Sequence, residues 1–562
     1  MKSLKCVLLV AGIVGASLML QSQQPVSAQG AGAAAPAADT ILTNGKIITV
    51  DETFSVAQAV AVRGSRIVAV GTNQEITRLA GPNTRRIDLR GRSVVPGFID
   101  NHAHFQEEGE YWTLEQRLDG VDTRKQALAL LVAKGKEKGP GEWVFTLGGW
   151  SPDQFKDDKK PFTRDELDKY LPNNPVLLQF TRAETYLNSK AIEAIGLEKR
   201  TEPWIYRDAN GRATGIVENA GAGMVRNAAG FLKEFPKEKF EANQMQMLKD
   251  LASAGLTASG GSCDFEDIYK GWAKEGRLSM RFFCFRTPEG KTPDERFANI
   301  PKLRYHDGDE WIDHSTWGEG LAGGGGGDVF SMTPPPPVAQ SAWDEWGRWA
   351  RAAAMVRAPI TIHTVTEQAV EGELREVEKI AKDIDIRGLR WAFMHMEGVN
   401  QNQIERMKAL NMIIMVHPRE TVSGGFLHRA HGDKAFAMPP LREIQDSGIL
   451  WGLGTDAYEV NQYRPFQTLQ WAVTGKMVGG TVVNTHTVTR EQALIAHTRS
   501  NAFLFYREYD LGSIQEGRLA DLVVTDKDYL TVPADQIETI KPVLTMVGGK
   551  VFHDTMNAAA TR

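Results

Sequence analysis

Eight short apolar runs in the middle of the chain, each ending in a polar or glycine-rich turn, most constrain its fold. They span 94–100, 255–260, 280–285, 311–319, 359–363, 389–395, 411–417 and 449–456. Helix-like segments lie between several of them, at 245–254, 367–382 and 401–410. Buried parallel strands have this near-continuous apolar character, and strand–helix alternation at this count is typical of a TIM-type barrel. We therefore predict an α/β protein with a (β/α)8 barrel over 93–505.

The two ends of the chain are similar to each other and differ from the centre. Residues 39–89 and 512–554 contain short apolar runs broken by glycines, a pattern of hairpins. We predict one small β-sandwich domain, built from 39–92 plus 506–562, with the barrel inserted between its halves. An excursion at 106–235, with strand-like pieces at 142–147, 175–180 and 215–218 and a helix capped at Thr163, predicts an inserted subdomain after the first barrel strand.

The first 28 residues have the pattern of an export signal. Lys2 and Lys5 precede an apolar run at 6–20, and small residues follow at 26–28. We expect a cleaved signal peptide over 1–28 and a flexible linker over 29–38, with an uncleaved N-terminal anchor as the alternative. No second apolar span follows, so we expect a periplasmic or secreted protein with no stable membrane span after cleavage. Cys263 and Cys284 form either one disulfide or two buried free thiols.

Charge and composition exclude some partners. The formal net charge is −5, so no basic face for nucleic acid is predicted. With 562 residues the chain can bury a large core. A glycine run and a proline run within 318–338 predict irregular structure, either a flexible loop or a lid over an active site. The sequence leaves a homo-oligomer open.

The ends of the predicted strands carry the residues that could take part in catalysis or metal binding. The side chains in question are His102, His104, Glu319, His363, His395, His417 and Asp456. In barrels of this type the carboxyl ends of the strands converge on one site. Neutral imidazole and carboxylate are the ligands that zinc and similar divalent ions select. We therefore predict a divalent metal site, with zinc as the expected ion, even though a single histidine on a strand is usually a core residue.

The sequence resembles a known family in these motifs. The HxH after PGFID, the histidines of the fifth and sixth runs, the GTD of the eighth and the closing GSIQEGRLADLVV resemble the amidohydrolase superfamily. The resemblance is closest to its composite-domain branch of YtcJ-like and N-substituted formamide deformylase-like hydrolases, and it includes WSPDQF and RDANGRATGIVENA in the excursion. It implies a metal-dependent hydrolase that cleaves carbon–nitrogen, amide-type bonds in a small molecule.

The resemblance also assigns roles to residues. It places His102, His104 and Asp456 on one metal, and His363 and His395 on a second metal or on substrate. Members of the family often carry a carboxylated lysine at the fourth strand, where this chain has Glu319. That difference leaves the number of ions, one or two, open. Asp456 is expected to act as general base and then general acid on a metal-activated water, with a helix cap as the alternative.

Several residues have two interpretations. His417 either touches substrate or is an ordinary buried histidine, and Trp150 either lines the pocket or packs in a core. Asp100 is expected to orient a ligand imidazole. Two other functions compete with amide hydrolysis. A mononuclear-metal deaminase of a heterocycle would need an acid beside His363, for which Glu367 is the nearby candidate. A non-catalytic exported protein would use the barrel for binding or regulation.

Overall fold

All eight predicted barrel strands are present in the computed structural model, which describes residues 36–230, 237–332 and 336–556. Neighbouring strands in the sheet are parallel, in the order β20-β19-β18-β17-β16-β15-β14-β8. The strands are β8 (Phe98–Asp100), β14 (Leu256–Gly261), β15 (Arg281–Phe285), β16 (Ile312–Glu319), β17 (Ile360–Thr364), β18 (Ala392–His395), β19 (Ile413–Val416) and β20 (Trp451–Leu453). The predicted fold class is confirmed.

Hydrogen bonds beyond the strand ends join the first and last strands. The backbone N–H of Thr455 donates to Asp100 Oδ1 over 2.9 Å, and the N–H of Asp456 donates to the carbonyl of His102 over 2.9 Å. Asp100 also accepts from the backbone N–H of His102 over 3.3 Å. Asp100 was expected to orient a ligand imidazole. Its described contacts instead tie together the two backbone segments that carry site residues.

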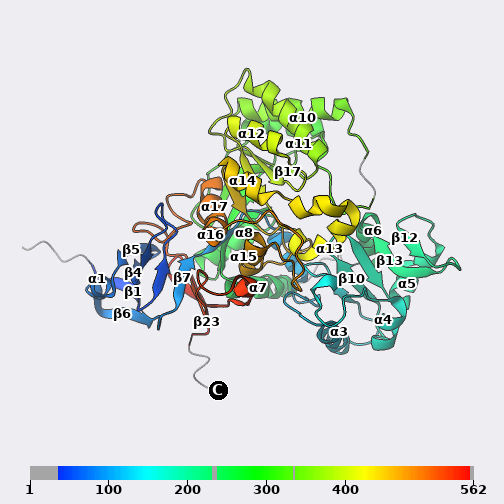
Figure 1. Ribbon diagram of the computed structural model, residues 1–562, viewed down its shortest axis with the longest axis horizontal. Helices are drawn as coiled ribbons and strands as arrows, with labels where there is room; N and C mark the ends of the chain where they lie inside the picture. The colour runs from blue at the N-terminus through cyan, green and yellow to red at the C-terminus, as the bar shows by residue number, and fades with distance from the viewer. Residues whose placement is uncertain (1–35, 231–236, 333–335, 557–562) are drawn as a thin grey trace, which may run out of the picture. The chain divides into compact units, whose positions relative to one another are not determined.

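Helices follow the barrel strands along the chain (Figure 1). Side chains of the residues just before them explain where several of them begin. Thr366 accepts from the N–H of Ala369, and Asn400 forms a capping box with Gln403. The helices are α7 (Lys237–Ser253), α8 (Glu266–Lys274), α9 (Pro293–Asn299), α10 (Gln340–Met355), α11 (Glu367–Ala381), α12 (Gln401–Ala409), α13 (Glu420–His431), α14 (Leu441–Ser447), α15 (Pro465–Thr474), α16 (Arg490–Ala496) and α17 (Arg499–Leu504).

The first predicted strand is two strands that belong to different sheets. Residues Ser93–Pro96 form β7, which pairs with strands from both ends of the chain, and only Phe98–Asp100 enters the barrel. The break falls at Gly97, where a Cβ would collide with the side chain of Thr257. Proline before this glycine cannot donate to a ladder. The chain therefore changes sheets between two consecutive buried segments.

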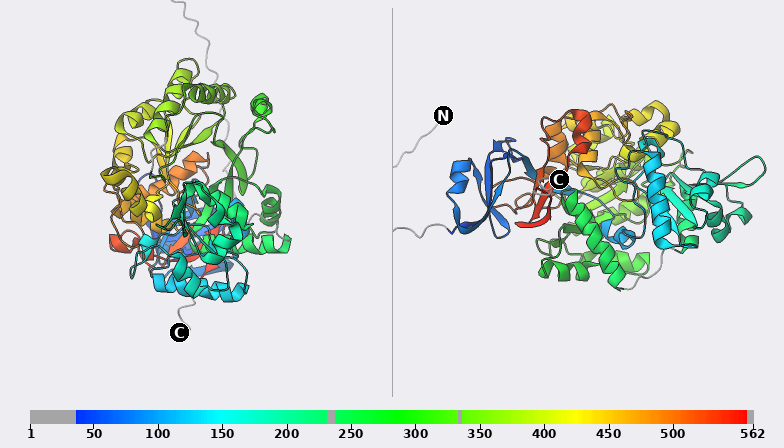
Figure 2. Two further views of the ribbon diagram at one scale, coloured as in Figure 1. Left: turned by 90° about the vertical axis from the view of Figure 1, so that its right-hand side faces the viewer. Right: turned by 90° about the horizontal axis from the view of Figure 1, so that it is seen from below.

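Both ends of the chain contribute to a six-stranded sheet, in the order β23-β22-β21-β7-β2-β3. A four-stranded sheet from the N-terminal end alone, β5-β4-β1-β6, accompanies it. Blue and red ribbons accordingly lie together in Figure 2. The strands are β1 (Ala38–Thr43), β2 (Lys46–Ile48), β3 (Val56–Ala57), β4 (Ala59–Arg63), β5 (Arg66–Gly71), β6 (Ala80–Asp88), β21 (Leu522–Thr525), β22 (Pro542–Val547) and β23 (Lys550–Asp554), with helix α1 (Asn73–Thr77) after β5.

The inserted segment has a five-stranded sheet of its own, in the order β12-β13-β11-β10-β9. The three predicted strand-like pieces and the helix capped by Thr163 are present, whereas β11 and β12 were not predicted. The elements are α2 (Phe105–Glu108), α3 (Arg124–Lys138), β9 (Val144–Thr146), α4 (Arg164–Tyr170), β10 (Val176–Phe180), β11 (Glu184–Leu187), α5 (Ser189–Ile195), β12 (Ile205–Arg207), β13 (Ala213–Glu218) and α6 (Asn219–Ala229).

Three other expectations concern single segments. Cys263 and Cys284 form a disulfide that joins the ends of β14 and β15. The glycine run packs closely, because a Cβ at Gly324 would collide with Trp346 and one at Gly326 with His363. The predicted signal peptide and all but the end of the linker lie outside the described residues. Within the described ranges, no helix combines the length and apolar character that crossing a membrane requires.

Candidate metal centre

The carboxyl ends of the barrel strands bring six of the predicted site residues together. Asp456 Oδ1 lies 3.3 Å from the Nε2 atoms of both His102 and His104. Glu319 Oε1 lies 3.4 Å from His102 Nε2 and 3.7 Å from His104 Nε2. Two imidazoles from one segment therefore face two carboxylates from β16 and the segment after β20.

A second set of site residues begins at the other oxygen of Glu319. Its Oε2 lies 3.5 Å from His363 Nδ1, and Asp456 Oδ2 lies 3.6 Å from His395 Nδ1. Two groups of ligand atoms fall within 4.8 Å of one another, namely His102 with His104 and Glu319, and Glu319 with His363 and His395. Glu319 is the member that the two groups share.

The donor set fits a divalent cation. Both ring nitrogens of His102 and the Nε2 of His395 are buried and have no hydrogen-bond partner among the described residues. Leaving such atoms unpaired is costly unless a ligand satisfies them. In the described ranges no lysine or arginine pairs with Glu319 or Asp456. The two carboxylates are therefore balanced only by imidazoles, which is the chemistry of a zinc-type site.

The electrostatics keep the carboxylates ionised. Burial alone would raise the pKa of Glu319, but His102, His363 and His104 together lower it to about 2. Burial likewise opposes ionisation of Asp456, and His395, His102 and His104 nevertheless hold its pKa well below the usual value. Both oxygen ligands are thus deprotonated at neutral pH, as metal binding requires.

Two of the site residues have an unusual backbone. His395 has a φ of 72° and Asp456 a φ of 58°, in the left-handed region that non-glycine residues seldom adopt. Such conformations cost of order 1–3 kcal/mol each and cluster at functional sites. Here they occur where β18 and the segment after β20 turn their side chains into the cluster.

Groups that the sequence did not single out hold the imidazoles in place. Glu107 Oε2 lies 3.2 Å from His104 Nδ1, and the carbonyl of Gly327 lies 3.1 Å from His363 Nε2. In each case the outer ring nitrogen donates, which leaves the inner one free to bind an ion. Phe285 stacks on His102 with ring centroids 5.5 Å apart. Of these groups only Glu107 carried a sequence signal, three residues after His104.

The structure does not place Trp150 and His417 as substrate contacts. Trp150 is fully buried in an aromatic core of the inserted subdomain, and its indole N–H donates to Thr146. It cannot line an open pocket, so that prediction is corrected. His417 is also fully buried, with one ring nitrogen 3.0 Å from His395 and the other 2.7 Å from Asn101. It lies behind His395 and its predicted substrate contact is corrected too.

Glu367 lies apart from the histidine cluster. Its Oε1 accepts a hydrogen bond from Asn400 Nδ2 over 2.9 Å, and the side chain is exposed at the start of α11. The cap of that helix is Thr366. Glu367 therefore has no described contact through which it could act as the acid that a heterocycle deaminase would need beside His363.

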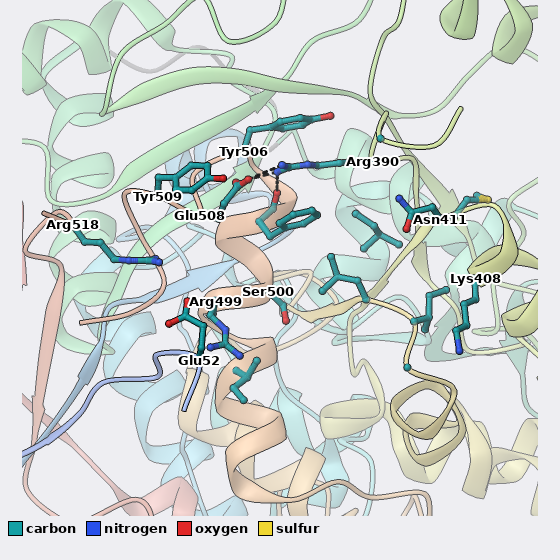
Figure 3. A pocket seen from close by; sticks show the side chains of 18 residues that line it. Glu52, Arg390, Lys408, Asn411, Arg499, Ser500, Tyr506, Glu508, Tyr509 and Arg518 are labelled. Atoms are coloured by element: carbon teal, nitrogen blue, oxygen red, sulfur yellow. Dashed lines mark hydrogen bonds and ion pairs between the residues drawn. The ribbon is translucent and has the colours of Figure 1, made fainter. Parts of the chain in front are cut away.

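A cavity of about 890 Å3 lies at the opposite end of the barrel strands (Figure 3). It is lined by residues at the starts of β18 to β20, and by α17 and the segment after it. Arg390 in this cavity pairs with Glu508 over 2.7 Å. None of the clustered histidines lines it. Because function in such barrels gathers at the carboxyl face, we assign the chemistry to the histidine cluster.

Comparison with known proteins supports this assignment. Residues 85–553 match the sequence pattern of the amidohydrolase family. The chain belongs to the amidohydrolase family. It is 25% identical over 558 residues to the N-substituted formamide deformylase of Arthrobacter pascens, covering 92% of this chain and 98% of that protein. It is 24% identical over 539 residues to the YtcJ protein of Bacillus subtilis (strain 168), named as an amidohydrolase, covering 91% and 98%. The predicted family and the predicted enzyme class are confirmed.

Solved structures agree on the fold of this amidohydrolase. A metal-dependent hydrolase from Pyrococcus furiosus superposes with a TM-score of 0.61 at 22% identity, covering 88% of this chain and 100% of that one. A zinc-bound adenosine deaminase from Xanthomonas campestris gives a TM-score of 0.52 at 15% identity, covering 94% and 97%. At these identities the likeness supports the architecture and not the substrate.

Proposed function

We propose that this amidohydrolase is an exported enzyme that hydrolyses an amide-type carbon–nitrogen bond in a small molecule. The observation that carries the proposal is the meeting of four imidazoles with Glu319 and Asp456 at one barrel mouth, where Asp456 Oδ1 lies 3.3 Å from two of them. A small-molecule substrate is consistent with a site that sits within the barrel mouth. The names of its relatives supply the bond type.

The proposed cofactor is zinc, with two ions per chain. His102, His104 and Asp456 would hold one, His363 and His395 the other, and Glu319 would be a ligand that both sites share. A divalent ion, when bound, lowers the pKa of water to about 7 and so supplies a nucleophile at neutral pH. Glu319 thereby takes the place that a carboxylated lysine often has in the family.

Asp456 is the proposed proton carrier. Its carboxylate is ionised and faces both halves of the cluster, so it can accept a proton from the attacking water. The same oxygen then donates that proton to the departing nitrogen. Without the proton, this nitrogen would have to leave as a strongly basic anion, which is a poor leaving group. His363, with 30% of its side chain exposed, is the most exposed of the four ligand histidines, so the substrate would approach the cluster from its side.

An N-substituted amide is the substrate class that we favour. The relative from Arthrobacter pascens is named for its action on N-substituted formamides, and it matches this chain over almost its whole length. The deaminase alternative is weaker, because Glu367 is engaged with Asn400 away from the histidines. Export is supported by the disulfide between Cys263 and Cys284, since such bonds persist in oxidising compartments.

The test replaces Asp456 with asparagine in the zinc-loaded enzyme. Loss of the proton carrier should lower kcat on a panel of N-substituted formamides and amides by at least about 100-fold. Asp433→Asn, at an exposed position, is the matched control and should behave like the wild type. Turnover of amides by the Asp456→Asn variant at the wild-type rate would contradict the assignment. Ammonia release from aminated heterocycles, with no action on amides, would favour the deaminase instead.

A further inference from the structure

Behind the cluster, a chain of buried polar side chains leads away from His395. His417 Nδ1 lies 3.0 Å from His395 Nδ1, and His417 Nε2 lies 2.7 Å from Asn101 Oδ1. Asn101 Nδ2 in turn donates to Asn501 Oδ1 over 3.1 Å. All four side chains are at most 1% exposed, so none of them exchanges hydrogen bonds with bulk water.

Asn501, the last side chain of this series, determines which atom of each hydrogen bond carries the proton. Asn501 Nδ2 is 2.7 Å from the carbonyl of Ile99 and 2.7 Å from the carbonyl of Leu453. Carbonyl oxygens only accept, so this atom must be the amide nitrogen with both hydrogens engaged. Asn501 therefore offers its oxygen to Asn101 Nδ2, and Asn101 offers its own oxygen to His417.

These hydrogen-bond directions in turn determine which ring nitrogen of His417 and of His395 carries the proton. His417 donates from Nε2 to Asn101, so in its neutral form its Nδ1 carries a lone pair. His417 is fully buried and its hydrogen-bond partners are His395 and the neutral amide of Asn101, so the neutral ring is the form that fits its surroundings. Nδ1 of His417 must accept from Nδ1–H of His395. His395 is left with its lone pair on Nε2, a buried atom with no hydrogen-bond partner in the described part of the chain.

We propose that Asn501, Asn101 and His417 form a relay of hydrogen bonds that fixes His395 in its Nδ1–H tautomer, so that its Nε2 lone pair is presented to a divalent ion. The three are positioning residues, and the inference rests on the proposed metal site. A histidine ligand whose outer nitrogen donates has a defined ring orientation and a more basic inner nitrogen. In this enzyme the acceptor is a second histidine in place of the usual carboxylate or carbonyl.

Two glycines, one in β20 and one just after it, make room for the relay. A Cβ at Gly452 would collide with Asn501 Oδ1, and a Cβ at Gly454 would collide with Asn101 Oδ1. Neither glycine has the positive φ that favours this residue elsewhere in the chain. Their absence of a side chain is therefore explained by the space that the two asparagines occupy, which is an observation independent of the hydrogen-bond distances.

The experiment compares His417→Leu with His417→Gln. Leucine removes the acceptor of His395, whereas a glutamine amide offers one acceptor and one donor and can replace both contacts. Competition with a zinc chelator should show affinity at the second zinc weakened by about 10–100-fold in His417→Leu and close to wild type in His417→Gln. Equal zinc affinity in the leucine and wild-type proteins would overturn the relay.

A second measurement on the wild type needs no variant and no metal. Nitrogen-15 NMR of metal-free protein with labelled histidines, with His395 identified by its loss in His395→Asn, reports which ring nitrogen is protonated. The relay predicts hydrogen on Nδ1 of His395, and hydrogen on Nε2 would overturn it. Failure of the wild type to bind zinc would instead refute the proposed function and leave this tautomer result to decide the relay alone.

Discussion

At the scale of single residues, Glu319 links the two halves of the site. Its two oxygens face different histidines, at 3.4 Å from His102 and 3.5 Å from His363. A carboxylate in this place needs no reaction with carbon dioxide to become a bridging ligand. The negative charge is also stabilised before any ion arrives, because the surrounding imidazoles lower the pKa of Glu319 to about 2.

A second carboxyl group near the site has the opposite character. Glu373 of α11 is buried, 2.6 Å from the hydroxyl of Thr364, and burial raises its pKa from 4.5 to about 8. Between these two pH values the folded protein holds a proton that the unfolded chain has lost. Stability therefore falls as pH rises through this range.

Glu373→Gln should remove that loss, because the amide carries no charge to bury. We predict that the melting temperature of the variant minus that of the wild type grows by roughly a few degrees between about pH 5 and pH 8. Thermal unfolding of both proteins across the range measures it. A difference that stays constant with pH would mean that Glu373 is not protonated in the folded state.

At the scale of elements, the sequence predicted which segments enter the barrel better than where they end. The apolar runs identified all eight strands, because burial on both faces leaves a strong pattern. The sequence did not predict that Pro96-Gly97 divides one run between two sheets, or that Asp456 lies three residues beyond β20. Those features depend on contacts with Thr257 and Asp100, which are remote in the sequence.

The candidate site was predictable to a similar degree. Histidines and carboxylates at strand ends have a recognisable composition, so the six clustered residues could be named in advance. Their supporting partners could not, since Asn101 and Asn501 are 400 positions apart and polar asparagines have no periodic pattern. Trp150 shows the converse limit, because an indole in a core and one in a pocket have the same sequence signature.

The disulfide links the ends of β14 and β15 covalently. Cys263 and Cys284 are separated by 21 positions, with Cα atoms 5.3 Å apart. Closing a loop of this length lowers the entropy of the unfolded chain, so replacing both cysteines with serine should cost about 3 kcal/mol of unfolding free energy. Denaturant unfolding measures it, and reductant should destabilise only the wild type. An equal free energy of unfolding in the wild type and in the variant with two serines would contradict the presence of the disulfide.

At the scale of the whole molecule, a buried ion pair joins the barrel to the composite sheet. Arg281 begins β15 and Asp521 precedes β21, with two hydrogen bonds of 2.8 and 3.0 Å between them. Both side chains are almost fully buried, at 0% and 4% exposed. The junction matters for the site, because β7 and β8 carry the chain from this sheet directly into the metal ligands.

Breaking that pair from one side should be costly. Asp521→Ala leaves a buried guanidinium without its partner, and we predict a loss of about 3–5 kcal/mol in unfolding free energy. The double variant Arg281→Met with Asp521→Leu removes both charges and should recover part of that loss. Chemical unfolding of the three proteins tests this, and a double variant less stable than Asp521→Ala would contradict the explanation.

Because we propose that Glu319 joins two metal sites in this amidohydrolase, the number of ions bound per chain is the decisive measurement. Elemental analysis of the purified, zinc-loaded protein should give about two ions per chain. Glu319→Ala should give about one or fewer, while Glu367→Gln, at an exposed glutamate, should match the wild type. A wild type with one ion per chain, and the same count in Glu319→Ala, would contradict the claim.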